Sequence, residues 1–168
     1  GYDITCGVRL LATPLGIDVV RPKVARLIVT LFASIPSGLG SSRSDLRLGD
    51  RDLDAVCTGG ARWAVQHGYG TTGDLECIEA GGCLPGADPA RVSARARKRG
   101  RDQLATVGSG NHFVEVGYVD ETFDPAAAEV LGLVPGRVTV FIHTGSRGFG
   151  HQVCDDYIDV MLKAVRRY

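Results

Sequence analysis

The sequence predicts an α+β fold in which mixed β-sheets are flanked by helices. Residues 3–11 and 137–142 have the apolar alternation or the β-branched and aromatic content typical of strands. Residues 50–67 and 151–167 instead carry apolar side chains near helical spacing. The 168 residues are 44% hydrophobic and 23% charged, which is close to the average for globular proteins. We therefore expect one folded domain over residues 1–168, without an internal boundary.

The first expected strand covers residues 3–11 and has one apolar face. Its alternate side chains are Ile4, Cys6, Val8 and Leu10. Asp3 and Cys6 are three positions apart, so a fully extended strand would point them to opposite faces. Both side chains can reach the same metal ion only if the chain bends, and a glycine favours such a bend. We therefore predict a bulge or turn at or beside Gly7.

Helical segments are expected next along the chain. Residues 24–32 are compatible with either a strand or a short helix. A helix of about 15 residues should begin at Asp50 or Asp52 and end at Gly68. The glycine pair at 59–60 weakens the middle of this helix.

Two further helix starts carry their own capping signals. Residues 71–74 form a capping-box sequence, and Asp88 followed by proline predicts a helix through Arg99 that Gly100 terminates. The second helix is strongly basic, because residues 91–101 contain six basic residues and no acidic one. The basic residues are Arg91, Arg95, Arg97, Lys98, Arg99 and Arg101. They form either a solvated face or a ridge that contacts phosphates, because positive charge concentrated on one element attracts polyanions.

The second half of the chain contains the strands that carry two histidines. Residues 104–119 predict a strand, a tight glycine turn that holds His112, and a second strand. The strand 137–142 delivers His143 to its C-terminal end. Two helices complete the prediction, at 125–132 and 151–167.

Composition limits the classes of function. Lys plus Arg equals Asp plus Glu at 19 each, which removes any whole-chain electrostatic argument for nucleic acid. No apolar run approaches the roughly 18 residues that span a bilayer. The five cysteines are scattered without a C-x-x-C pair: Cys6, Cys57, Cys77, Cys83 and Cys154. We expect a cytoplasmic protein with no membrane partner and no disulfide framework.

Two glycine-rich segments, 108–113 and 141–148, each place a histidine at the edge of an apolar run. Small residues allow a ligand to approach the main chain closely. Together with a carboxylate and a thiol near the start of the chain, the histidines form a donor set suited to a transition metal. The four candidates are Asp3, Cys6, His112 and His143. Each histidine could instead be structural, and Cys6 could be a small hydrophobic side chain.

A strand, a glycine-rich loop and a helix follow one another around Ser146 and Arg147. Free N–H groups in such a loop and at a helix N-terminus bind anions, and arginine adds a bidentate donor for phosphate. The loop contains neither the P-loop pattern nor the dinucleotide-binding glycine pattern. From these residues alone, phosphate binding and a purely structural loop are equally supported.

Three long motifs occupy residues 1–11 (GYDITCGVRLL), 108–116 (GSGNHFVEV) and 143–153 (HTGSRGFGHQV). With CLPGADP at 83–89 and GRDQL at 100–104, they closely resemble the RtcB family of RNA-splicing ligases. The resemblance covers essentially the whole chain and implies that the chain forms part of the RtcB-like fold.

The resemblance also implies an activity. The family joins an RNA 3′-phosphate or 2′,3′-cyclic phosphate to a 5′-hydroxyl in tRNA splicing and RNA repair, using GTP and Mn²⁺ through a guanylylated histidine. RNA ends such as tRNA halves, together with GTP, would be the partners. By this resemblance Asp3, Cys6, His112 and His143 match ligands of two Mn²⁺ ions, with the Cys6 thiolate bridging them. Zn²⁺ or Co²⁺ could substitute, because thiolate and imidazole favour them over Mn²⁺ by raw affinity.

The remaining site residues fall into two groups. By the resemblance, a guanine-nucleotide segment comprises Asn111, His112, Phe113, Val114 and Glu115. Phosphates of RNA or nucleotide are expected at Ser146, Arg147, Arg95, Lys98, Arg99 and Arg101. The guanylylated histidine matches no residue of this chain, so no catalytic residue is assigned.

The sequence does not begin with Met and opens directly on a candidate metal ligand. We therefore expect residues 1–168 to be a single partial domain of a longer ligase, largely inactive alone and prone to self-association or to complementation by other parts. Two alternatives stay open: a non-catalytic metal- and RNA-binding module, and a metal-dependent phosphoester hydrolase.

Overall fold

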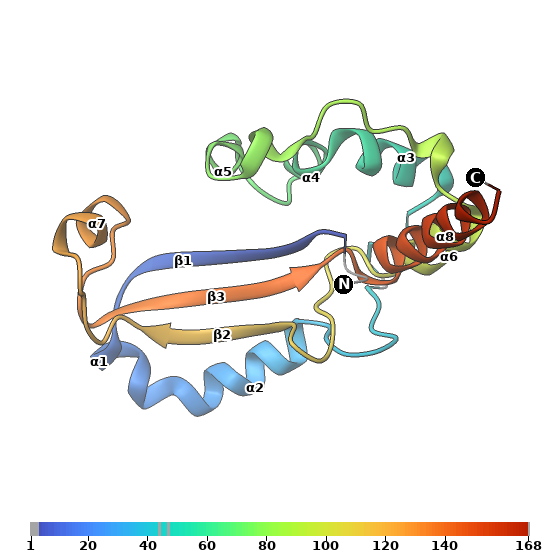
Figure 1. Ribbon diagram of the computed structural model, residues 1–168. Helices are drawn as coiled ribbons and strands as arrows, with labels where there is room; N and C mark the ends of the chain where they lie inside the picture. The colour runs from blue at the N-terminus through green and yellow to red at the C-terminus, as the bar shows by residue number, and fades with distance from the viewer. Residues whose placement is uncertain (1–3, 44, 47, 168) are drawn as a thin grey trace. The chain divides into compact units, whose positions relative to one another are not determined.

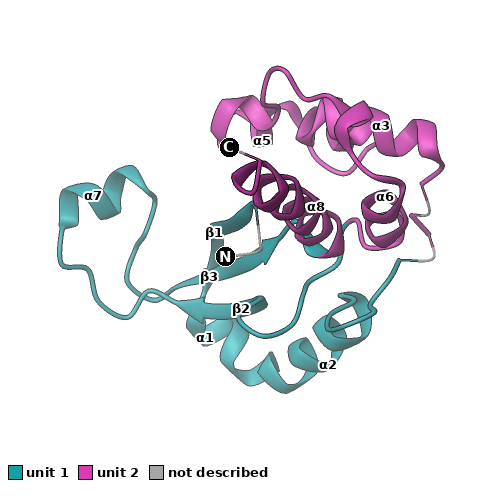
Figure 2. Cartoon of the chain, turned by 45° about the vertical axis from the view of Figure 1, so that its right-hand side comes forward, with its two compact units in different colours: residues 1, 3–43, 105–147 teal, residues 2, 44–104, 148–168 magenta. Residues whose placement is uncertain are grey.

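The computed structural model describes residues 4–43, 45–46 and 48–167. The described residues form two compact units (Figure 2). Unit 1 comprises residues 4–43 and 105–147, and unit 2 comprises the described residues between 45 and 104 together with 148–167. The α+β class is confirmed, while a single partial domain over the whole chain stays a prediction.

Unit 1 is built on a three-stranded antiparallel sheet (Figure 1). Its strands are β1 (Cys6–Gly16), β2 (Phe113–Tyr118) and β3 (Arg137–Gly145). The order is β1-β3-β2, so β3 is central, and its β-branched sequence is well suited to that place. The predicted strand at 137–142 is confirmed and extends through His143 to Gly145.

The predicted bulge at Gly7 is wrong. Gly7 pairs in register with Thr144, and the register shift lies between Ala12 and Gly16. Within that interval Pro14 has no N–H to donate to the ladder. Thr13 substitutes for part of the pairing, because its hydroxyl donates to the Val138 carbonyl at 2.8 Å. The irregularity is therefore explained by a proline that the prediction did not consider.

The helices of unit 1 resolve an ambiguity in the sequence. They are α1 (Ile17–Val20), a 3₁₀ turn (Arg21–Lys23), α2 (Val24–Ser34) and α7 (Pro125–Val130). Residues 24–32 are thus helical, with an apolar stripe at 24, 27, 28 and 31. The first strand expected within 104–119 is wrong, since Val107 makes only an isolated bridge with Ser37.

Unit 2 is helical. Its elements are α3 (Asp50–Gly59), α4 (Ala61–Gln66), α5 (Thr72–Glu76), α6 (Ala94–Gly100), α8 (Arg147–Val165, the first residue belonging to unit 1) and 3₁₀ turns at Glu79–Gly82 and Pro89–Arg91. Its buried cluster consists of Leu46, Leu48, Leu53 and Trp63. The helix expected from Asp50 breaks at Gly60, where φ is 55° and ψ is −137°.

Two other helix predictions need correction. The helix expected from Asp88 through Arg99 is interrupted, because Ser93 leaves helical geometry and its hydroxyl accepts from the Ala96 N–H at 3.1 Å. The last helix begins at Arg147 rather than His151. Its first turn is stabilised by the Gln103 side chain, whose oxygen accepts from the Gly148 N–H at 2.9 Å.

Candidate functional site

Strand pairing in unit 1 brings three of the predicted metal ligands together. On β1, Cys6 lies opposite Gly145 of the central strand, and on β2 Phe113 lies opposite His143. His112 immediately precedes β2, and β2 begins at the end of the sheet where β1 begins and β3 ends (Figure 1). Antiparallel register therefore joins residues that are 106 and 137 positions apart in sequence.

The donor atoms of these side chains converge. The Cys6 Sγ lies 2.8 Å from His143 Nε2 and 3.5 Å from His112 Nε2. The candidate ligand atoms of all three residues lie within 4.8 Å of one another. Cys6 is exposed, whereas both imidazoles are half-buried. One thiol and two imidazoles at this spacing form a group that could hold a metal ion. The fourth predicted ligand, Asp3, lies outside the described residues.

Aromatic packing fixes the imidazole of His143. The Phe113 ring meets it edge-on, with ring centroids 5.7 Å apart and an interplanar angle of 83°. Phe113 also packs edge-on against Phe141 at 5.4 Å. The His112 and His143 rings lie 5.3 Å apart at 74°. His143 is therefore flanked by the rings of Phe113 and His112, which limit the orientations that its Nε2 can adopt.

A hollow of about 560 Å³ opens beside His112. One wall is the segment 112–116, so four of the five residues predicted to contact a guanine nucleotide line it, whereas Asn111 does not. A second wall is the apolar face of α2, formed by Val24, Leu27, Ile28, Leu31 and Phe32. Sequence reasoning missed this second wall because it left residues 24–32 undecided between strand and helix.

Arg147, predicted to hold a phosphate, has protein partners in unit 1. Its Nη2 donates to the Gly38 carbonyl and to the Ser41 hydroxyl, each at 2.9 Å, and its Nε donates to the Thr106 hydroxyl at 3.1 Å. Burial lowers the pKa of Arg147 from its ordinary value. Its backbone φ is 54°, in the left-handed region. The guanidinium therefore ties the loop around residue 38 to the end of β3, next to half-buried Ser146.

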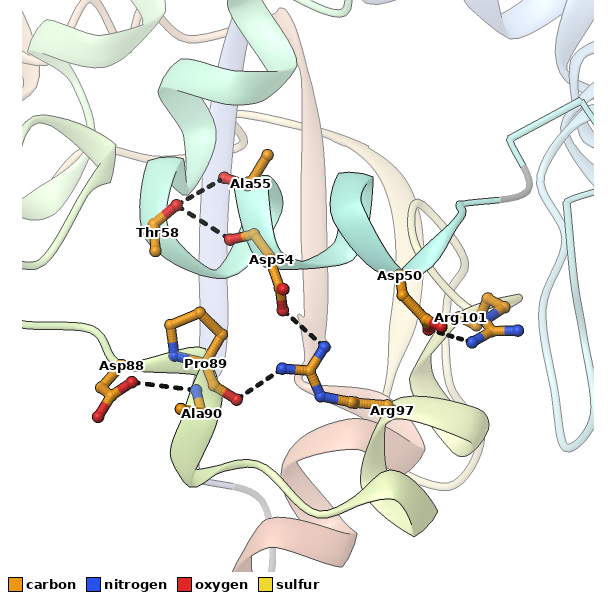
Figure 3. Close-up of polar contacts among 9 residues, drawn as sticks. All are labelled: Asp50, Asp54, Ala55, Thr58, Asp88, Pro89, Ala90, Arg97 and Arg101. Carbon is orange, nitrogen blue, oxygen red and sulfur yellow. Dashed lines mark hydrogen bonds and ion pairs between the residues drawn. The ribbon is translucent and has the colours of Figure 1, made fainter.

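The basic side chains around α6 divide into two sets. Arg97 and Arg101 are paired within unit 2 (Figure 3). The Arg97 Nη1 lies 2.6 Å from Asp54 Oδ1 and its Nη2 donates to the Pro89 carbonyl, while Arg101 pairs with Asp50.

Of the other bases, Arg91 pairs with Asp88 at 3.3 Å, and the rest face solvent or α8. Arg99 donates to the Gln152 side-chain oxygen at 2.8 Å. Asp156 on α8 accepts from the Ser93 hydroxyl and from Gln152, and these bonds, with the nearby charge of Arg95, lower the pKa of Asp156. Arg95 and Lys98 are exposed. They are the members of the ridge best placed to meet an external phosphate.

Within the described part of the chain, no helix combines the length and apolar character that crossing a membrane requires.

Comparison with known proteins identifies similar sequences. The family model described as "tRNA-splicing ligase RtcB" matches residues 1–168. A protein of that name from Archaeoglobus fulgidus is 53% identical over all of this chain, which covers 35% of the relative. The protein of that name from Thermococcus kodakarensis is 54% identical with the same coverage. That from Pyrococcus abyssi is 52% identical over 97% of this chain and 18% of the relative. The chain thus spans about a third or less of the length of these relatives.

Proposed function

The chain belongs to the RtcB family, and on that premise we propose that it forms part of a cytoplasmic RNA ligase that acts in tRNA splicing and RNA repair. The proposed reaction joins an RNA 3′-phosphate or 2′,3′-cyclic phosphate to a 5′-hydroxyl and uses GTP and Mn²⁺. The observation that carries this proposal is the convergence of Cys6, His112 and His143 at one end of the sheet.

The donor set fits the metal that the proposal requires. A Zn²⁺ ion lies about 2.3 Å from a bound thiolate and about 2.0–2.1 Å from a bound imidazole nitrogen, so donors of one such ion lie a few ångströms apart. The separations of 2.8 and 3.5 Å from the Cys6 Sγ are of this order. We propose that these residues, with Asp3, bind two Mn²⁺ ions, for which Zn²⁺ or Co²⁺ could substitute. Two bound cations would neutralise phosphate charge and stabilise the charge that develops during transfer.

The hollow beside His112 supports a nucleotide site. A planar nucleobase can pack against apolar side chains such as those of α2, and the exposed Glu115 carboxylate can accept from base N–H groups. We propose that residues 111–115 contact the guanine nucleotide of GTP. Half-buried His112 would then belong to both the metal site and the wall of the nucleotide site.

The proposal assigns RNA phosphates to Ser146, Arg147, Arg95, Lys98, Arg99 and Arg101. The exposure of Arg95 and Lys98 supports direct contact, whereas Arg147 already donates to three acceptors of unit 1. Exposed apolar side chains on β1 also support self-association through this edge strand. They are Val8, Leu10, Leu11 and Leu15.

The ligation activity is tested with a full-length protein that contains this chain. One RNA ending in 3′-phosphate and another beginning with 5′-hydroxyl are incubated with and without GTP and Mn²⁺, and products are separated on a denaturing gel. We expect joined RNA only when both cofactors are present. Phosphoester cleavage without GTP would identify a hydrolase instead, and metal and RNA binding without either reaction would identify a binding module.

The basic ridge is tested by reversing two charges on this chain, Arg95→Glu with Lys98→Glu. We expect weaker binding of single-stranded RNA, because each lost phosphate contact reduces counterion release. The slope of log affinity against log salt should fall by about 0.7 per contact. Fluorescence anisotropy at several salt concentrations measures both quantities.

The matched control reverses two charges in unit 1, Lys23→Glu with Arg26→Glu, and changes the net charge equally. Both control residues are exposed. An equal loss of affinity in the two variants would mean that net charge alone matters, and unchanged binding in the ridge variant would remove the ridge from the RNA site.

A further inference from the structure

We propose that Gly108 is a positioning residue that holds the His112 imidazole in the metal-binding cluster, by leaving no side chain in the space that the ring occupies. A β-carbon built on Gly108 would overlap His112 Nδ1 and would lie 2.9 Å from His112 Cγ. Real β-carbons essentially never approach other heavy atoms so closely. Any side chain at position 108 therefore requires movement of the ring or of the backbone. This inference rests on the metal site proposed above.

Hydrogen bonds to the segment 36–38 hold the backbone at residues 107 and 108 in place. The Gly38 N–H donates to the Gly108 carbonyl at 3.0 Å and to the Val107 carbonyl at 3.1 Å. The Val107 N–H donates in turn to the Pro36 carbonyl at 2.9 Å. Movement of the residue 108 backbone away from the His112 ring would break these hydrogen bonds in a buried segment. Each broken bond would leave polar groups without their partners.

The His112 ring is the component that can move. It is half-buried, and its Nε2 lies on the side of Cys6 at 3.5 Å. A second atom near the built β-carbon is Arg147 Nη1, at 2.8 Å, but the end of an arginine side chain adjusts more easily than a short imidazole. We infer that a methyl group at residue 108 would displace the ring and carry Nε2 away from the Cys6 and His143 donors, while leaving the sheet intact.

The test compares Gly108→Ala with wild type by titrating the chain with Co²⁺ and recording the visible absorption of the bound ion. We expect Co²⁺ affinity to fall about 10- to 100-fold, the usual effect of losing support for a ligand. Gly16→Ala is the matched control, because a β-carbon there meets nothing within 4 Å. Circular dichroism should show that both variants keep the fold. Unchanged Co²⁺ affinity in Gly108→Ala would overturn the inference.

A double-mutant cycle of Gly108→Ala with His112→Ala tests the inference even if Gly108→Ala is too unstable for the metal titration. If the methyl group acts through the ring, removing the ring should relieve the overlap, so Gly108→Ala should reduce thermal stability less in the His112→Ala background than in wild type. An equal loss of stability in both backgrounds would overturn the inference. If wild type and Gly16→Ala bind no Co²⁺, the proposed metal site fails, and the stability cycle still reports whether Gly108 controls the ring.

Discussion

Replacing Cys6 with alanine should reduce the metal content of the chain, after loading with Mn²⁺, from about one or two ions to close to none. The Cys6 Sγ is the atom that lies within hydrogen-bonding distance of both His112 Nε2 and His143 Nε2. Without it the cluster keeps two imidazoles, which hold a divalent ion far more weakly than the complete set. Elemental mass spectrometry after removal of free metal measures the ratio of metal to protein.

Cys77→Ala is the matched control for this experiment. Cys77 is also an exposed free cysteine, but it lies in unit 2 and outside the donor cluster. This variant should retain the wild-type metal content. If Cys6→Ala binds as much Mn²⁺ as wild type, Cys6 is not a ligand and the proposed centre is wrong. An absence of metal from the wild-type chain would mean that residues 1–168 do not hold the ion by themselves, and the metal site proposed for this chain would fail.

Local signals in the sequence predicted those parts of the fold that neighbouring residues determine. The strand at 137–142 is β-branched and aromatic throughout, and the structure confirms it. The short helix after Asp124 has both a proline in its first turn and a side-chain cap, since Asp124 Oδ1 accepts from the Ala127 N–H at 3.0 Å. Such elements carry their start signals within a few residues, so the sequence is sufficient to identify them.

The errors arise where distant contacts compete with local preference. Residues 88–99 have strong helix formers, yet the chain breaks before α6 because Ser93 caps it and bonds to Asp156, 63 positions away. The last helix starts early because the Gln103 side chain, 45 positions away, binds its first turn. Nothing near these residues in the sequence indicates either partner.

The candidate site shows the same division. His112 and His143 were recognisable from their glycine-rich surroundings, and the structure brings both to Cys6. The apolar wall contributed by α2 was not recognisable, because the stripe of residues 24–31 has no distinctive chemistry. The hydrogen-bond partners of Arg147 could not be predicted from the sequence either, since Gly38 is 109 positions away in the chain. Sequence motifs identified the residue types, whereas the fold determined their neighbours.

Arg147→Ala should lower the free energy of unfolding by about 2–4 kcal/mol, because it removes three hydrogen bonds from a charged donor. Those bonds reach Gly38, Ser41 and Thr106, and Thr106 is 5% exposed. The variant should therefore loosen the loop around Gly38 from the end of β3. Urea denaturation, followed by circular dichroism, measures the change. If Arg147 only bound phosphate and did not stabilise the fold, its replacement would leave the free energy of unfolding unchanged and would lower only the affinity for RNA.

Arg147→Gly separates the side-chain contacts from the backbone conformation. It removes the same hydrogen bonds as Arg147→Ala, but glycine adopts the observed φ of 54° without strain. We expect this variant to be about 1 kcal/mol more stable than Arg147→Ala. Equal stability of the two variants would mean that the left-handed conformation is not maintained once the guanidinium is gone. If both variants keep wild-type stability but bind RNA more weakly, Arg147 binds phosphate and does not stabilise the fold.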